Sequence, residues 1–351
     1  MNIELRGGLQ TVMSNPHSKH NYFGWPTVCR LKNGRLAAVA SGFRLAHVCP
    51  FGKTVIAFSE DEGKTWSAPA PVFDTPLDDR DGGICAFGES GVIVTSFNNT
   101  AAFQRSRAKG VDPYRDGYID RITSDDERLY HAAAYRVSFD NGVTFGPIHR
   151  VPIIAPRGPI ELRDGTILMV GHGFNAEDPF PIEVYRLGLD GNAAHLSSIS
   201  LPQTDRLFCE PHCIELHDGT LLCHIRVQQD GYKLFTLYET RSRDGGKSWT
   251  EPRQLLGDTE GAPAHLMYCK DGTLLCSYGR RNPPYDIRVM ASKDHGKTWS
   301  EPATLFTSPY SRDLGYPSTV ELTNGDLLTV FYAHPTENAP AHILSQKWRI
   351  T

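Results

Sequence analysis

Side chains that bind anions and transfer protons flank many of the short apolar segments of this sequence. Arginine can bind a carboxylate through two parallel hydrogen bonds, and histidine, tyrosine and acidic side chains can donate or accept protons. Close to the starts of apolar segments lie Trp25, Asp79, Asp81, Glu210, His212, His265 and Tyr316. After the ends of apolar segments lie Arg44, His47, His172, Arg226, Arg280 and Arg281. If one fold brings these residues together, they form a candidate site for acid–base chemistry on an anionic or oxygen-rich molecule.

Pairs of apolar segments recur along the chain and are joined by short turns. Each pair surrounds an Asn-Gly, Asp-Gly or Ser-Gly dipeptide, which is a β-hairpin signal. The six copies begin at Gly24, Asp81, Gly158, Cys209, Gly261 and Gly315. The sequence therefore predicts six related hairpins.

A second motif, Ser-x-Asp-x-Gly-x-Thr/Ser-aromatic, alternates with these hairpins. It occupies residues 59–66, 138–145, 242–249 and 292–299, and its spacing predicts a degenerate copy at Asp190 and Gly191. The aspartate of such a motif can accept hydrogen bonds from turn amides, and the glycine can adopt a conformation that a side chain disfavours. We interpret this motif as a folding device and not as a ligand site.

Together the two motifs predict an all-β, six-bladed β-propeller with four antiparallel strands per blade. The repeat holds four strands in about 50 residues, which is typical of propeller blades. The last blade lacks one strand, so we expect Ile3 to Val12 to close the ring as its outer strand. Residues 1–351 would form one domain, with an inserted polar loop at about 99–130 over the active-site face. The insertion suits a lid, an oligomer contact or a solvated decoration.

The predicted ring also explains how the polar residues could meet. The start of the first strand and the end of the second strand of a blade open on the same face, because the two strands run antiparallel. We therefore expect the candidate residues to gather at one mouth of the central channel, as binding sites commonly do.

The motifs, the six-bladed pattern and the spacing of these residues resemble the sialidase (neuraminidase) superfamily over essentially the whole chain. The resemblance implies an exo-acting glycosidase that removes an acidic terminal sugar. It implies Tyr316 as nucleophile and Glu210 as the carboxylate that activates it. It further implies that Arg44, Arg226 and either Arg280 or Arg281 hold the substrate.

Two features depart from the pattern of that superfamily. The place of its first arginine reads Gly24-Trp25-Pro26, and the segment Leu45 to Pro50 lacks the expected acid/base aspartate. We expect His47 or Asp81 to donate the proton instead. Trp25, Asp79, His172, His212 and His265 are the further candidate substrate contacts.

Two other functions remain open. A lyase could eliminate across a uronate, with His47, His172, His212 or His265 as base and Tyr316 as acid, and related rhamnosidases resemble such enzymes. A propeller could also bind carbohydrate without catalysis.

Composition and the absence of certain motifs limit the classes of partner and cofactor that the sequence predicts. The chain has 36 Lys+Arg and 40 Asp+Glu, a formal net charge of −4, which excludes nucleic-acid binding through bulk positive charge. No apolar run approaches the roughly 20 residues that cross a bilayer, and no secretory signal is visible, so we expect a cytoplasmic protein that binds no membrane. No Cys-x-x-Cys pair occurs, and we expect no metal centre and no obligatory cofactor, although calcium on the propeller axis stays open. The expected partner is an oligosaccharide or glycoconjugate.

Overall fold

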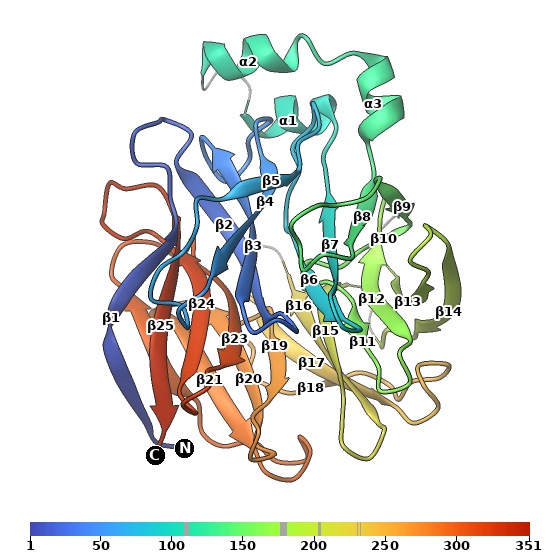
Figure 1. The fold of residues 1–351 in the computed structure, drawn as a ribbon, viewed down its shortest axis with the longest axis vertical. Helices are drawn as coiled ribbons and strands as arrows, with labels where there is room; N and C mark the ends of the chain where they lie inside the picture. Colours follow the sequence, from blue (N-terminus) through green and yellow to red (C-terminus); the bar gives the residue numbers. More distant parts are fainter. Residues whose placement is uncertain (109–111, 176–180, 203–204, 230, 232) are drawn as a thin grey trace.

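The computed structural model describes residues 1–108, 112–175, 181–202, 205–229, 231 and 233–351. Within these residues the strands form six antiparallel sheets around a central channel, which confirms the predicted propeller (Figure 1). The first sheet contains β2 (Tyr22–Arg30), β3 (Leu36–Arg44), β4 (Lys53–Ser59) and β5 (Ala70–Phe73). The second contains β6 (Ile84–Phe87), β7 (Gly91–Phe97), β8 (Ala133–Ser138) and β9 (His149–Val151).

The third sheet differs slightly from the others, because two short strands share its inner edge. These are β10 (Ile153–Ile154) and β11 (Ile160–Glu161), which both pair with β12 (Ile167–Gly173). The sheet continues with β13 (Ile182–Leu187) and β14 (Ala193–Ile199). The inner edge is thus interrupted by the segment 155–159.

The remaining sheets have the regular four-stranded pattern. The fourth contains β15 (Leu207–Glu215), β16 (Leu221–Gln228), β17 (Phe235–Ser242) and β18 (Arg253–Gln254). The fifth contains β19 (His265–Tyr268), β20 (Leu274–Arg280), β21 (Tyr285–Ser292) and β22 (Ala303–Ser308). The sixth contains β23 (Gly315–Glu321), β24 (Leu327–Ala333), β25 (His342–Ile350) and β1 (Ile3–Met13).

The two ends of the chain close the ring. Strand β1 pairs antiparallel with β25, so that Ile3 lies opposite Ile350 and Leu5 opposite Trp348. In Figure 1 the blue β1 runs beside the red β25, and both termini lie at the bottom of the molecule. The predicted role of the N-terminal strand is therefore confirmed.

Apolar side chains between neighbouring sheets hold the blades together. One cluster combines Phe23 and Ala38 of the first sheet with Val330 and Tyr332 of the sixth, all fully buried. Because each sheet packs against two neighbours in this way, the blades are held as a ring around the channel.

The Ser-x-Asp motifs form the turns between third and fourth strands. Asp61 Oδ1 accepts from the backbone amides of Lys64 and Thr65 at 3.0 and 2.8 Å, and the Thr65 hydroxyl donates to Oδ2 at 2.7 Å. In the degenerate copy Asp190 accepts from the Asn192 amide at 3.2 Å. These bonds are local, which fits the structural role assigned to the motif.

The insertion after β7 is helical, where the sequence analysis expected a loop. It contains α1 (Ala101–Ala108), α2 (Pro113–Ile119) and α3 (Ser124–Tyr130) and stands above the ring in Figure 1. Asn98 joins the two ends of the insertion, because its side chain accepts from Ala132 N at 3.1 Å and donates to Tyr130 O at 2.9 Å. Gln104 of α1 donates to Asp78 at 2.7 Å, so the insertion packs against the loop between the first and second sheets.

Among the described residues, no helix has the length and apolar character needed to cross a membrane.

Candidate active site

Four residues close to the starts of inner strands lie in the left-handed region of backbone conformation. The φ angles are 56° at Trp25, 51° at Asp81, 49° at Glu210 and 51° at Tyr316. Bulges in the ladder follow Gly24, Cys209 and Gly315, directly before three of these residues. Bulges re-aim side chains, and positive φ at non-glycine residues is costly and gathers at functional sites. Backbone strain therefore occurs at the equivalent position in each of four blades.

The Tyr316 hydroxyl lies between a carboxylate and a guanidinium. Arg226 Nη1 donates to the Tyr316 oxygen at 3.3 Å and to Glu210 Oε2 at 2.7 Å. The Tyr316 hydroxyl and the Glu210 carboxylate thus share one guanidinium nitrogen, and the hydroxyl lowers the pKa of Glu210. Tyr316 is 3% exposed and Arg226 6%, so water screens this group poorly.

The electrostatics of the group set its proton positions. Burial raises the pKa of Glu210, but Arg226, the Tyr316 hydroxyl and Arg281 outweigh it and hold that pKa below its usual value. Burial and then the charge of Glu210 raise the pKa of Tyr316 well above 10. At neutral pH the carboxylate is thus charged and the phenol keeps its proton, which it can pass to Glu210 when the oxygen attacks an electrophile.

The neighbouring arginines 280 and 281 point to different places. Arg281 donates from Nε to Leu314 O at 3.1 Å and from Nη2 to the Tyr332 hydroxyl at 2.7 Å, with its guanidinium 5.8 Å from the Tyr316 ring centroid. Arg280 instead lies 3.8 Å from Glu260. Arg281 therefore belongs to the mouth of the channel, and the expectation of a substrate contact does not hold for Arg280.

The expectation for Arg44 also fails. Its side chain is fully buried and donates to Asp78 Oδ1 at 2.5 Å, the Ser41 hydroxyl at 2.8 Å and His47 O at 3.0 Å. A further bond runs from Nε to Ala46 O at 3.4 Å. Because its donors are directed at the protein, Arg44 holds the loop that carries His47 and does not face a ligand.

Arg80 is the arginine that the sequence analysis missed. Its guanidinium lies 4.4 Å from the Trp25 ring centroid, and its Nε lies 3.4 Å from Asp81 Oδ1. The sequence places Arg80 directly before the predicted site residue Asp81, but only the acidic residues of that segment were predicted to belong to the site. Trp25 itself is 2% exposed and packs between Arg44 and Arg80.

The pKa values of Asp81 and Glu210 are shifted in opposite directions. Burial raises the pKa of Asp81, with Arg80 lowering it and the charge of Glu210 raising it. Two carboxyl groups whose surroundings push their pKa values apart suit an acid and a base.

His47 is part of a network around Asp313. Its Nδ1 lies 2.9 Å from Asp313 Oδ1 and 3.2 Å from the Tyr22 hydroxyl. Asp313 also accepts from the Tyr332 hydroxyl at 3.1 Å and lies 3.4 Å from His334 Nε2. Burial would raise the pKa of Asp313, but His334 and His47 hold it far below its usual value. Tyr22, His47, Asp313 and His334 line an open cavity of about 630 Å³, and the sequence analysis missed Asp313.

Burial lowers the pKa of His47, although the hydrogen bond and charge of Asp313 act in the opposite direction. The imidazole is therefore neutral at neutral pH and can accept a proton.

His172, His212 and His265 are not among the residues that line that cavity. His172 Nδ1 accepts from the Glu210 amide at 3.4 Å, so it supports the strained backbone of Glu210 from behind. Burial lowers the pKa of His172 to about 4. His212 and His265 lie deeper and line a cavity on the opposite face of the ring, which corrects the expectation for both.

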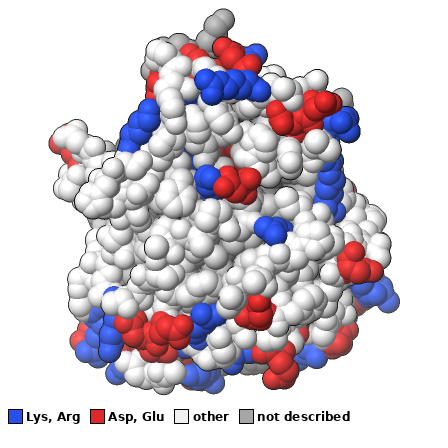
Figure 2. Space-filling model, turned by 45° about the horizontal axis from the view of Figure 1, so that its top comes forward, with Lys and Arg blue, Asp and Glu red and all other residues white. Residues whose placement is uncertain are grey.

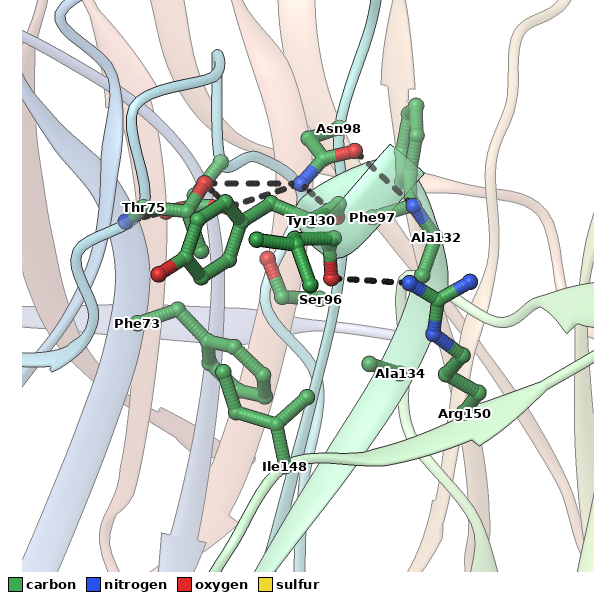
Figure 3. A pocket seen from close by; sticks show the side chains of 12 residues that line it. Phe73, Thr75, Ser96, Phe97, Asn98, Tyr130, Ala132, Ala134, Ile148 and Arg150 are labelled. Atoms are coloured by element: carbon green, nitrogen blue, oxygen red, sulfur yellow. Dashed lines mark hydrogen bonds between the residues drawn. The ribbon is translucent and has the colours of Figure 1, made fainter. Parts of the chain in front are cut away.

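Asp79 also points away from the channel. Its carboxylate accepts from the Thr75 amide at 2.6 Å, the Thr75 hydroxyl at 2.9 Å and Asn98 Nδ2 at 3.2 Å. It lines a separate cavity of about 170 Å³ between the first two sheets, where Figure 3 shows Thr75, Asn98 and Tyr130 close together. Burial raises the pKa of Asp79 to about 7. Asp79 is therefore not placed to contact a ligand at the mouth.

The face that carries the insertion is largely uncharged around its centre. Figure 2 shows a small group of basic and acidic side chains there, surrounded by neutral surface. In the described parts of the chain, no three His, Cys, Asp or Glu side chains gather as metal ligands.

Comparison with known proteins agrees with this architecture. A protein of unknown function from Dyadobacter fermentans superposes with a TM-score of 0.79 at 20% identity, with 99% of each chain covered. The NanB sialidase from Streptococcus pneumoniae gives 0.69 at 14% identity, covering 97% of this chain and 70% of that one. The α-L-arabinanase from Penicillium chrysogenum gives 0.64 at 16% identity, covering 99% and 98%. No curated protein matches the sequence.

The fold is thus that of the sialidase superfamily, a propeller shared with glycosidases. Residues 118–329, more than half of the chain, match the BNR repeat-like domain, and the protein belongs to that family.

Proposed function

We propose that this protein is an exo-acting glycosidase that removes an acidic terminal sugar from an oligosaccharide or glycoconjugate. The observation that carries the proposal is the Tyr316 hydroxyl held between Glu210 and Arg226 at the mouth of the channel. A neutral phenol beside a charged carboxylate suits attack on an anomeric carbon that bears a negative group, because a charged nucleophile would be repelled.

The reaction would proceed in two displacements. The Tyr316 oxygen attacks the anomeric carbon while its proton passes to Glu210, and the bond to the leaving oxygen breaks. Asp81, which keeps its proton to higher pH, protonates the leaving oxygen and becomes a carboxylate. His47, which is neutral at neutral pH, is not assigned this role. Water then attacks the anomeric carbon and gives one proton to the Asp81 carboxylate. The bond between the sugar and Tyr316 breaks, and the proton returns from Glu210 to the phenolate.

Arginines would bind the carboxylate of the sugar. The Arg281 guanidinium lies 5.8 Å from the Tyr316 ring centroid, so its positive charge can act on a ligand at the mouth. Arg80, whose guanidinium lies 4.4 Å from the Trp25 ring centroid, would take the place of the arginine that the sialidase pattern has in the first blade.

The test is release of sugar from fluorogenic glycosides by the wild type and two variants. We expect turnover of an α-sialoside, or of a uronide or arabinoside in the same panel, to fall at least about hundredfold in Tyr316→Phe and in Glu210→Gln. Tyr268→Phe, on the opposite face, is the control and should keep wild-type turnover. Full activity in either active-site variant would rule out the proposed roles.

β-Elimination from a uronate is the second candidate, because neutral His47 beside Asp313 could serve as base. An elimination creates an unsaturated product that absorbs in the near ultraviolet, and hydrolysis does not. Absorbance during turnover of a uronate-capped oligosaccharide therefore separates the two reactions.

A further inference from the structure

A second cavity opens into the central channel on the face opposite Tyr316. It has a volume of about 590 Å³ and is lined by inner-strand residues from around the ring. At its inner end lie Arg157, His212 and His265, which are 1%, 8% and 8% exposed. None of these three has a role in the proposed glycosidase reaction.

Arg157 is a buried cation without a close anion. Its Nη1 donates to Pro26 O at 3.3 Å and Tyr316 O at 3.2 Å, and its Nη2 donates to Pro263 O at 3.4 Å. Within the described residues its Nε has no hydrogen-bond partner, and no carboxylate lies within the 4.0 Å of an ion pair. Glu210 and Asp81 act on it only from farther away. A buried guanidinium in such surroundings is costly unless something compensates its charge.

The two histidines present N–H groups to the same space. His212 Nδ1 accepts from Leu266 N at 2.9 Å, and His265 Nδ1 accepts from Thr319 N at 3.3 Å. A backbone amide can only donate, so each Nδ1 carries a lone pair and each neutral ring has its proton on Nε2. The rings stack with centroids 4.8 Å apart and planes at 16°, and both residues line this cavity.

We propose that this end of the channel binds a small monovalent anion, such as chloride, held by Arg157 and by Nε2–H of His212 and His265. The inner end offers a cation and hydrogen-bond donors, which suit an anion and repel a metal cation. This arrangement also argues against the calcium ion that the sequence had left open for the axis. A bound anion would steady the guanidinium that donates to the Tyr316 carbonyl, and so would link the two faces of the ring.

The direct test is a crystal of the full chain soaked in bromide, which replaces chloride and scatters anomalously. We expect a bromide peak within hydrogen-bond distance of the two Nε2 atoms and beside Arg157. An unoccupied or water-filled inner end at high bromide concentration would overturn the proposal.

The matched variants use the geometry of amide side chains. His265→Asn keeps an acceptor where Nδ1 stands but removes the Nε2–H donor, whereas His265→Gln restores a donor near the Nε2 position. Thermal unfolding in chloride against gluconate, at constant ionic strength, measures anion binding through its stabilisation of the folded state. We expect the dissociation constant for chloride to rise about tenfold in the Asn variant and less than about threefold in the Gln variant.

Arg163→Gln, at the rim of the same cavity, is the control for diffuse attraction and should change the dissociation constant less than about twofold. Equal chloride stabilisation of the wild type and a folded Asn variant would contradict the site. If the Asn variant fails to fold, the bromide position in the wild type decides the question. Neither measurement depends on glycosidase activity, so this proposal can fail while the proposed function stands.

Discussion

At the scale of single residues, one structural position serves different chemistry in different blades. Trp25, Asp81, Glu210 and Tyr316 all lie close to the starts of inner strands and all have positive φ. Trp25, Glu210 and Tyr316 also precede proline, a context that normally favours extended backbone. The ring over-determines these conformations and brings an aromatic platform, two carboxyl groups and a phenol toward one axis.

Arg281 and Arg280 provide a matched pair for testing carboxylate recognition. We expect Arg281→Lys to raise KM for an acidic sugar by about tenfold or more, because lysine cannot reproduce the planar, two-pronged contact of arginine. Arg280→Lys should leave KM within about twofold, since Arg280 lies beside Glu260 and away from the mouth. Steady-state kinetics on the best substrate of the panel measures both. Equal effects of the two substitutions would count against the assigned positions.

Asp79 should give stability a distinct pH dependence. Its pKa is about 7 in the folded state and about 4 when exposed, so between these values the native protein holds a proton that the unfolded chain has released. The free energy of unfolding of the wild type therefore falls as pH rises through this window. Asp79→Asn does not titrate, so its free energy of unfolding minus that of the wild type should become more positive from pH 5 to pH 8. Urea denaturation measures this difference.

Asp61→Asn is the control for that experiment. Hydrogen bonds with Thr65 lower the pKa of Asp61 to about 2, so its contribution to stability is present above about pH 4 and is lost only as pH falls toward 2. Its difference from the wild type should stay constant between pH 5 and pH 8. A constant difference for Asp79→Asn as well would mean that Asp79 is ionised throughout.

At the scale of elements, the Ser-x-Asp turns and the insertion contribute in different ways. The turns lie at the end of the ring opposite Tyr316: Glu62 in the first motif accepts from Thr323, in the turn between β23 and β24. The helical insertion lies at the other end, where Gln104 contacts Asp78, the partner of Arg44. A substitution in a turn should therefore alter the stability of the fold. A substitution in the insertion should instead be able to alter the site at the mouth, because the insertion lies at that end of the ring.

Loss of an aspartate in these turns should cost stability in proportion to its bonds. Asp61 accepts from two amides and the Thr65 and Ser59 hydroxyls, whereas Asp190 accepts only from Asn192. We expect Asp61→Ala to lower the melting temperature by a few degrees and Asp190→Ala to lower it less. Both variants should keep wild-type turnover. Calorimetry gives the two melting temperatures, and a larger loss for Asp190→Ala would contradict this account.

At the scale of the whole molecule, one pairing between chain ends turns a row of blades into a ring. Without β1, the hydrogen-bonding edge of β25 would face water, and the buried Val12 and Met13 would be lost from the core. In an unclosed propeller the first and sixth sheets would keep only the contacts that do not involve β1, such as their apolar cluster and the hydrogen bond from Phe23 N to Ala341 O.

Removal of residues 2–13 should therefore destabilise the entire fold. We expect a drop in melting temperature of more than about 10 °C or a loss of cooperative unfolding. Leu9→Ser is the control, because Leu9 lies on β1 but is 44% exposed, and it should melt within a few degrees of the wild type. A truncated chain that melts like the wild type would show that ring closure adds little.

Repeats and strand alternation in the sequence were sufficient to predict the number of blades and the ring closure. They also indicated Tyr316, Glu210 and Arg226, which the fold brings into contact. Each of these residues lies near the start or end of a strand that the repeated hairpin motif identifies in every blade. The motif therefore locates the residue within its blade.

The depth and direction of individual side chains, in contrast, emerged only from the folded chain. Alternation along a strand does not predict the bulges, and a bulge of one residue turns the later side chains of that strand to the other face. Such a bulge lies between Cys209 and His212. His212 and His265 both line the opposite cavity although they stand beside the mouth in sequence. Arg44 and Asp79 likewise bind loop groups that only the fold brings near, while Arg80 and Asp313 reach the mouth from loops without a repeat to mark them.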